Sequence, residues 1–96
     1  MPGLTIREEW IRAVALVHSG DTGNAVRVLG GILKIEPDQA VARTYLGLAL
    51  LMAGDLAGAV SELRRAREAG LPLTDLLLGM SLRAAGDPSA AGPGAK

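Results

Sequence analysis

The sequence contains no cysteine and no phenylalanine, and Trp10 and Tyr45 are its only aromatic residues. Without cysteine, the chain can form neither a disulfide framework nor a thiolate zinc site. Hydrophobic residues still make up 49% of the 96 residues. An interior that is built from alanine, leucine, valine and glycine favours closely packed helices over a sheet sandwich, and this length is enough for one small domain.

The sequence also lacks an excess of charge and a long apolar run. Ten basic and ten acidic residues cancel, so no electrostatic footprint indicates nucleic acid or an anionic membrane as a partner. The longest apolar run, residues 46–54, is too short to span a bilayer. Residues 1–12 lack the pattern of a secretory signal. Together with the absence of cysteine, these features lead us to expect a cytoplasmic protein.

No group of residues indicates catalysis. His18 is the only histidine, so the chain offers no histidine pair for a metal ion. The serines lack the Gly-x-Ser-x-Gly context of a nucleophile elbow. The glycine groups at 20–23 and 30–31 are not followed by the Gly-Lys-Ser/Thr of a phosphate loop. We therefore expect no enzyme activity, no cofactor and no metal site.

The dipeptide Gly-Asp divides the chain into repeats. It occurs at Gly20-Asp21, Gly54-Asp55 and Gly86-Asp87, with spacings of 34 and 32 residues. A glycine that ends a helix can adopt the left-handed conformation, and an aspartate after it can cap the next helix. The pattern predicts helix–turn–helix units, with Gly54-Asp55 as the turn at the centre of the chain.

The apolar periodicity between these turns predicts an all-α domain of about five helices. We expect them at residues 6–18, 22–35, 39–53, 56–69 and 73–85, with a domain over 5–88. Residues 1–4 are expected to be a frayed end and 89–96 a disordered tail, since the Gly92-Pro93-Gly94 segment has little to bury. The expected caps are a Thr5/Glu8 capping box, Asp21 or Thr22, Asp38, and Asp55.

The second helix of each of the first two repeats carries one feature that needs an explanation: a glycine pair in helix 22–35 and a row of charged residues in helix 56–69. Gly30-Gly31 falls near the middle of the expected helix 22–35, where each glycine costs about 1 kcal/mol relative to alanine. Close helix packing, tolerated weakness, or a flat spot for a partner backbone would each account for this pair. On the helix 56–69, Glu62, Arg65 and Glu68 are spaced three apart, which predicts a solvated face with ion pairs within the helix.

The chain resembles the tetratricopeptide repeat family, a helix–turn–helix unit with a period of about 34 residues. The middle unit carries the family pattern at eight positions: Leu46, Gly47, Leu50, Gly54, Asp55, Ala59, Leu63 and Ala66. The resemblance implies an α-solenoid fragment of antiparallel helix hairpins with repeats at about 6–38, 39–70 and 71–91, the last one truncated. It also implies that Gly47 lets the third and fourth helices approach each other closely.

In this family the first helix of each unit lines a groove that receives a peptide or a partner helix. The resemblance implies that the groove residues most relevant to binding are Trp10, Val14, Val17, Thr44, Leu48, Leu51, Met52, Leu76, Met80 and Arg83. It adds Arg7, His18, Val41, Leu73 and Ala84 at the margins. These positions lack the lysine, arginine and asparagine with which some members bind a terminal carboxylate. The alternative is that the array is too tight to leave a groove, so that these side chains form core.

The predicted function is a non-catalytic protein–protein interaction module, an adaptor or scaffold that binds an amphipathic helix or extended segment of a partner protein. Flexible Met52 and Met80 suit such a ligand. The alternatives are a small dedicated chaperone, similar to the tetratricopeptide chaperones of type III secretion, and a self-associating assembly subunit. Self-association through helix 73–85 is considered because its apolar residues are too many for a terminal capping helix.

Overall fold

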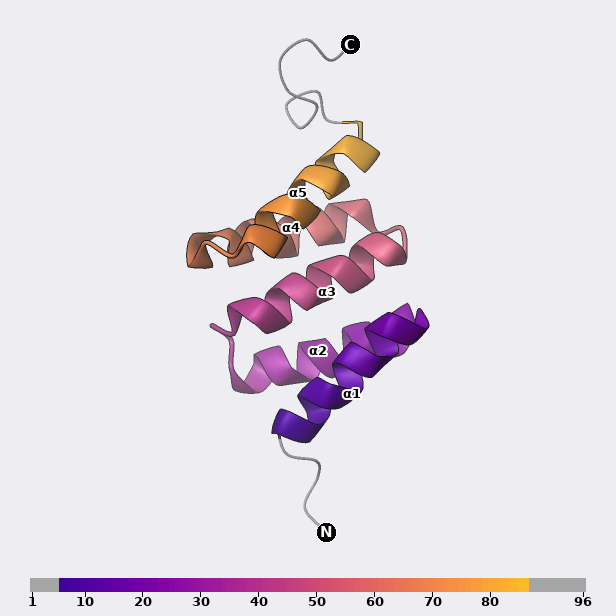
Figure 1. The fold of residues 1–96 in the computed structure, drawn as a ribbon, viewed down its shortest axis with the longest axis vertical. Helices are drawn as coiled ribbons and strands as arrows, with labels where there is room; N and C mark the ends of the chain where they lie inside the picture. The colour runs from indigo at the N-terminus through magenta and orange to yellow at the C-terminus, as the bar shows by residue number, and fades with distance from the viewer. Residues whose placement is uncertain (1–5, 87–96) are drawn as a thin grey trace.

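The computed structural model describes residues 6–86, which form five α-helices and one short 3-10 helix (Figure 1). Their bounds are α1 (Ile6–Ser19), α2 (Thr22–Ile35), α3 (Ala40–Met52), α4 (Leu56–Ala66), η1 (Arg67–Ala69) and α5 (Pro72–Ala84). No strand occurs among these residues, which confirms the all-α prediction. The expected frayed end 1–4, Thr5 of the expected capping box and the expected tail 89–96 lie outside the described residues.

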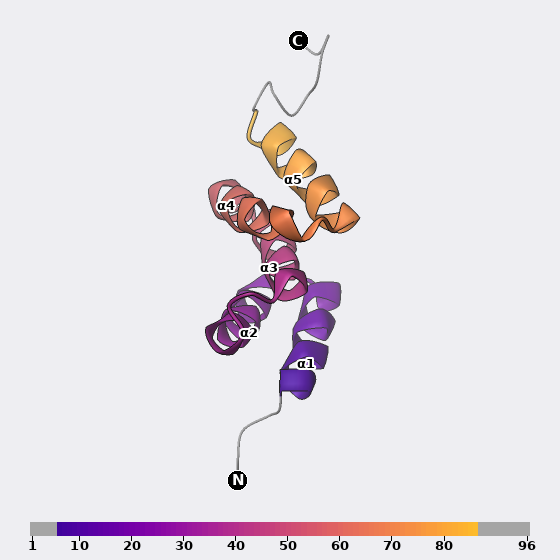
Figure 2. The same cartoon turned by 90° about the vertical axis from the view of Figure 1, so that its left-hand side faces the viewer.

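The helices form an array of antiparallel hairpins. The side view shows α2 and α4 along one side of the array, α1 and α5 along the other, and α3 between them (Figure 2). α3 packs against each of the other four α-helices. The hairpin array that the repeat pattern predicts is therefore confirmed, and α3 is its central helix.

The Gly54-Asp55 turn has the geometry that the sequence predicts. Gly54 has a φ of 85°, and the backbone N–H of Asp55 donates to the carbonyl of Leu50 at 2.9 Å, which closes the end of α3. The Asp55 carboxylate then accepts from the backbone N–H of Gly58 at 3.0 Å and caps α4. The Gly20-Asp21 turn repeats these features between α1 and α2.

Three helix ends differ from the prediction. Asp38 does not cap α3; Gln39 does, since its side chain accepts from the backbone N–H of Val41 at 3.3 Å. α4 ends at Ala66, and the residues that were expected to extend it form η1 before Gly70 turns the chain with a φ of 72°. α5 begins at Pro72, whose missing N–H is tolerated in the first turn of a helix.

The buried side chains form two clusters that α3 connects. The first cluster joins α1, α2 and α3 through Ala13, Val17, Ala25, Leu29, Ile32, Ala42, Leu46 and Ala49. The second joins α4 and α5 through Ala59, Leu63, Leu77 and Leu78. Leu48 and Leu50 of α3 pack against both clusters. Because each cluster needs α3, neither hairpin can bury its apolar residues without it.

α4 approaches α3 closely at Gly47. A Cβ at this position would lie 2.5 Å from Cγ of Leu63, which is fully buried in α4. The absence of a side chain therefore lets α4 pack directly on the backbone of α3. The equivalent glycine of the third repeat, Gly79 in α5, has nothing within 4 Å of its Cβ position.

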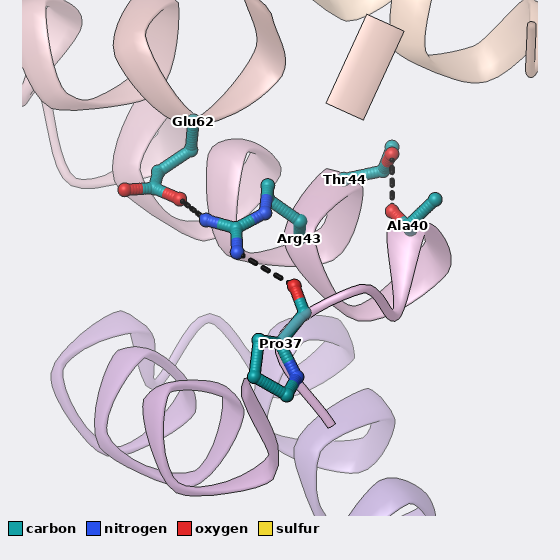
Figure 3. Close-up of polar contacts among 5 residues, drawn as sticks. All are labelled: Pro37, Ala40, Arg43, Thr44 and Glu62. Atoms are coloured by element: carbon teal, nitrogen blue, oxygen red, sulfur yellow. Dashed lines mark hydrogen bonds and ion pairs between the residues drawn. The ribbon is translucent and has the colours of Figure 1, made fainter. Parts of the chain in front are cut away.

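Arg43 links the turn before α3 to α4 (Figure 3). Its Nη1 donates to Oε1 of Glu62 at 2.6 Å and its Nη2 to the carbonyl of Pro37 at 2.8 Å. The two charged side chains are only 13% and 21% exposed. The prediction that Glu62 pairs with Arg65 in its own helix is wrong, because Glu62 points toward α3.

Gly30 and Gly31 do not mark close helix packing. A Cβ at either position would meet no atom within 4 Å other than nearby helix backbone. The packing explanation is therefore wrong for this pair. Gly30 is partly buried, and Gly31 is exposed and lines a hollow between α1 and α2. Each glycine weakens α2 and gives no contact in return within residues 6–86.

We predict that Gly47→Leu lowers the free energy of unfolding by about 3 kcal/mol, because the new side chain overlaps the fully buried Leu63. The matched control is Gly79→Leu, which introduces the same side chain at the equivalent position of α5. We expect this control to be at least as stable as the wild type, since its Cβ enters open space and leucine favours the helix. Urea unfolding measures both, and equal destabilisation of the two variants would contradict the assigned repeat alignment.

We further predict that Gly30→Ala and Gly31→Ala each raise the free energy of unfolding by about 1 kcal/mol, because alanine favours the helix and the space is empty. The double variant should gain about twice as much, as far as the two effects add. Thermal unfolding measures the gain. A loss of stability in either single variant would show that these positions have close neighbours after all.

Candidate protein-binding surface

Nine of the ten predicted groove residues hold equivalent positions on the three first helices, and Met52 is the tenth. The repeat spacings align Trp10 of α1 with Thr44 of α3 and Leu76 of α5. They likewise align Val14 with Leu48 and Met80, and Val17 with Leu51 and Arg83. The exposure of equivalent residues nevertheless differs strongly between helices. The structure thus separates the predicted groove into interior and surface.

Two of the ten residues lie in the interior. Thr44 is 1% exposed and Val17 is 4% exposed. Val17 belongs to the first core cluster, and Thr44 is covered where α3 meets α5. Neither side chain can contact a ligand in this conformation, so we exclude both from the candidate surface.

Thr44 instead joins two repeats through a buried hydrogen-bond chain. Its hydroxyl donates to the carbonyl of Ala40 at 2.8 Å (Figure 3). The hydroxyl oxygen of Thr74 lies 2.6 Å from that of Thr44. Because Thr44 has one hydrogen and gives it to Ala40, Thr74 is the donor in this second bond. This contact fixes α5 parallel to α3 at their N-terminal ends.

Four further residues are partly buried at the seams between repeats: Trp10, Val14, Leu48 and Leu51. Trp10 meets Tyr45 edge to face, with the ring centroids 5.2 Å apart and the planes at 86°. Leu48 and Leu51 pack against the second core cluster. These four side chains pack between helices, and only part of each is accessible to a ligand.

The remaining predicted residues, Met52, Leu76, Met80 and Arg83, are exposed. Val41 and Leu73 join them, so that five large apolar side chains of α3 and α5 are 39–57% exposed. Leu73, Leu76 and Met80 follow the i, i+3, i+7 spacing of one helix face. Val41 and Leu73 hold equivalent positions on parallel helices. Met80 lies about two turns further along α5, and Met52 about three turns further along α3. We call these five residues the apolar face: Val41, Met52, Leu73, Leu76 and Met80.

A hollow of about 520 Å³ lies beside the apolar face, where the starts of α1 and α3 meet the end of α2. Trp10 and Val41 form part of its wall, and Arg7 and Glu36 place one charge of each sign at it. The hollow also has contributions from Ile32, Glu36 and Gln39. The sequence pattern did not indicate these three residues or Ile6, which also lines the hollow. Ile32, Glu36 and Gln39 lie outside the first helices that the pattern follows, and Ile6 is the first residue of α1.

Comparison with known families agrees with this arrangement. The family model described as Tetratricopeptide repeat matches residues 16–71, which include the end of α1, the whole of α2, α3 and α4, and η1. The chain belongs to the tetratricopeptide repeat family. No curated protein matches it.

Tetratricopeptide repeats are in general protein–protein interaction modules, and the family is generally non-enzymatic. Among residues 6–86, no helix has both the length and the apolar character that crossing a membrane requires. The exposed part of the first helices among residues 6–86 includes the apolar face, and the hollow at Trp10 lies beside it.

The buried position of Thr44 leads to a prediction. Thr44→Val removes the acceptor of Thr74 and leaves a fully buried hydroxyl without its partner, which should lower the free energy of unfolding by about 2 kcal/mol. Thr44→Val combined with Thr74→Val removes both hydroxyls, and we expect it to recover most of that loss. Urea unfolding of the two single variants and the double variant forms the required cycle. Unchanged stability of Thr44→Val would contradict the assigned hydrogen bond between Thr44 and Thr74.

Proposed function

We propose that this tetratricopeptide protein is an adaptor or scaffold whose apolar face binds an amphipathic helix or an extended segment of a partner protein. The observation that carries the proposal is the grouping of five exposed apolar side chains on two neighbouring first helices. Contiguous exposed apolar surface on a protein of this kind is typical of an interface. The ten basic and ten acidic residues of the chain leave no single-signed field that would favour a nucleic acid instead.

The shape of the surface indicates how such a segment would be held. The apolar spacing on α5 matches a ligand helix with anchors at i, i+3 or i+4, and i+7. Met52 and Met80 have unbranched, flexible side chains that adapt to different anchors. The hollow beside Trp10 has room for one larger side chain of the ligand, and Arg7 and Glu36 at its wall can pair with ligand charges.

A second candidate function is an obligate subunit or dedicated chaperone, or a self-associating assembly subunit. It is favoured by Leu76, which is 57% exposed on α5 and would be covered in a permanent complex. Stoichiometric co-purification with one small subunit would favour the chaperone, and a dimer that persists on dilution would favour self-association. Weak binding of varied segments by a monomer favours the adaptor.

We predict that Met80→Asp weakens the binding of helical peptides at least about tenfold while the protein stays folded, because the charge enters the apolar face at a side chain that is already 41% exposed. The probes are 16-residue peptides selected from a display library on the wild-type protein. Fluorescence anisotropy measures their affinity and circular dichroism the thermal transition. The selected peptides should share apolar anchors at helical spacing.

The matched control is Ile11→Asp, which places the same charge at a 60% exposed apolar residue of α1, outside the apolar face. We expect it to bind the peptides as the wild type does. If Met80→Asp unfolds the protein, Met52→Asp tests the same surface from α3, where the side chain is 47% exposed. Peptides that bind Met80→Asp and Met52→Asp with unchanged affinity would refute a ligand site on the apolar face.

A further inference from the structure

α5 repeats the surface with which α3 receives α4. Three features of α3 at its contact with α4 define this surface: Arg43, which pairs with Glu62; the bare backbone of Gly47 beneath Leu63; and Leu50, which packs on the second core cluster. The repeat spacing of 32 residues places Asp75, Gly79 and Leu82 at the equivalent positions of α5. α5 therefore carries the three parts of a docking surface for a second helix.

Within residues 6–86, nothing covers this surface. The Cβ position of Gly79 has open space around it, whereas that of Gly47 is filled by Leu63. Asp75 makes one loose ion pair, 3.7 Å from Oδ1 to Nε of Arg67, and both side chains are more than 60% exposed, so this pair contributes little stability. Leu82 lines a hollow of about 710 Å³ between α4 and α5, together with Leu56 and Val60.

A glycine inside a helix costs about 1 kcal/mol relative to alanine. At Gly47 this cost is offset by the packing of Leu63, but at Gly79 no contact offsets it. Gly79 therefore leaves bare backbone in the middle of one face of α5. Asp75, whose carboxylate is exposed, and the partly buried Leu82 lie on either side of it. This combination matches the half of the α3–α4 interface that α3 provides.

The sequence after α5 does not supply the other half. Asp87 and Ala91 correspond to Asp55 and Ala59, as the start of a second helix requires. The next residues are Gly92-Pro93-Gly94, and a proline inside a helix costs about 3 kcal/mol. At the position equivalent to Leu63 the sequence has Ala95, which is too small to repeat the contact that Leu63 makes.

We propose that the outer face of α5, formed by Asp75, Gly79 and Leu82, binds an amphipathic helix of another protein that takes the place of the second helix of the third repeat. The α3–α4 interface defines its chemistry. A leucine would lie over Gly79 as Leu63 lies over Gly47, with small residues four before and three after it, as Ala59 and Ala66 are in α4. Because Asp75 stands where α3 has Arg43, the residue before that leucine is lysine or arginine rather than glutamate.

A second copy of the chain fits this requirement poorly. In α4 the residue before Leu63 is Glu62, and in α2 the residue before Leu29 is Val28. Leu63 and Leu29 are also fully buried within their own chain. The occupant is therefore a helix from a different protein. The surface is separate from the apolar face, since Asp75, Gly79 and Leu82 follow a different stripe of α5 from Leu73, Leu76 and Met80.

The test uses two synthetic peptides with the sequence of residues 55–69, the segment that packs on α3. One peptide is unchanged, and the other carries Glu62→Lys so that its charge complements Asp75. Calorimetric titration of the full chain should show saturable binding of the Glu62→Lys peptide and about tenfold weaker binding of the unchanged peptide. Exchanging the charge on the protein with Asp75→Lys should reverse this preference.

Gly79→Leu tests the slot itself, because the new side chain occupies the space that the peptide leucine needs. We expect it to weaken the binding of the Glu62→Lys peptide at least about tenfold while the thermal transition does not fall below that of the wild type. A peptide with Leu63→Ala should lose affinity in parallel. Met80→Asp, which disrupts the apolar face, should leave this peptide bound, so failure of this site and failure of the proposed function are distinguishable.

Three results would overturn the proposal. The first is no saturable binding of the Glu62→Lys peptide to the wild-type protein. The second is equal affinity of that peptide for the wild type and Gly79→Leu. The third is a dimer of the protein alone, seen by light scattering across a dilution series, that Gly79→Leu abolishes, since this would assign the surface to a second copy.

Discussion

The rest of the structure depends on the central position of α3 between the two core clusters. Its 13 residues contribute to both core clusters, and they pack against each of the other four helices. Where α4 packs on α3, there is no room for a bulky side chain on α3. Gly47 resolves the conflict by removing the side chain opposite Leu63, so that α4 comes near enough for Arg43 to reach Glu62 at 2.6 Å.

The parts of the fold that arise from local chemistry could be predicted from the sequence. The glycine of each Gly-Asp pair ends a helix with a positive φ, and the aspartates at 21 and 55 cap the next helix, because both effects involve only neighbouring residues. Gln39 in place of Asp38 as a cap, and η1 at the end of α4, could not be predicted. The pairing of Glu62 with Arg43 of α3 could not be predicted either. The Arg43–Glu62 ion pair is partly buried, whereas Arg65 is exposed.

The candidate surface could be predicted only in part, because equivalent repeat positions do not have equivalent surroundings. Thr44 and Leu76 hold the same place in successive repeats, yet Thr44 is 1% exposed and Leu76 is 57% exposed. The difference is that α5 covers α3, and no described helix follows to cover α5 in the same way. In a repeat array each unit contacts its neighbours, so exposure depends on the place of the unit in the array as much as on its own residues.

α5 consequently has unused surface of two different kinds. Its apolar stripe, Leu73, Leu76 and Met80, has the spacing of a general helix-binding face. The stripe of Asp75, Gly79 and Leu82 has the specific layout of half an α3–α4 interface. The two stripes are turned from each other by about a third of a turn around the helix axis. One helix can therefore contact a segment lying across the first helices and a second helix seated beside α4 at the same time. Such an arrangement suits an adaptor, because each ligand would bury part of α5 and leave the other stripe free.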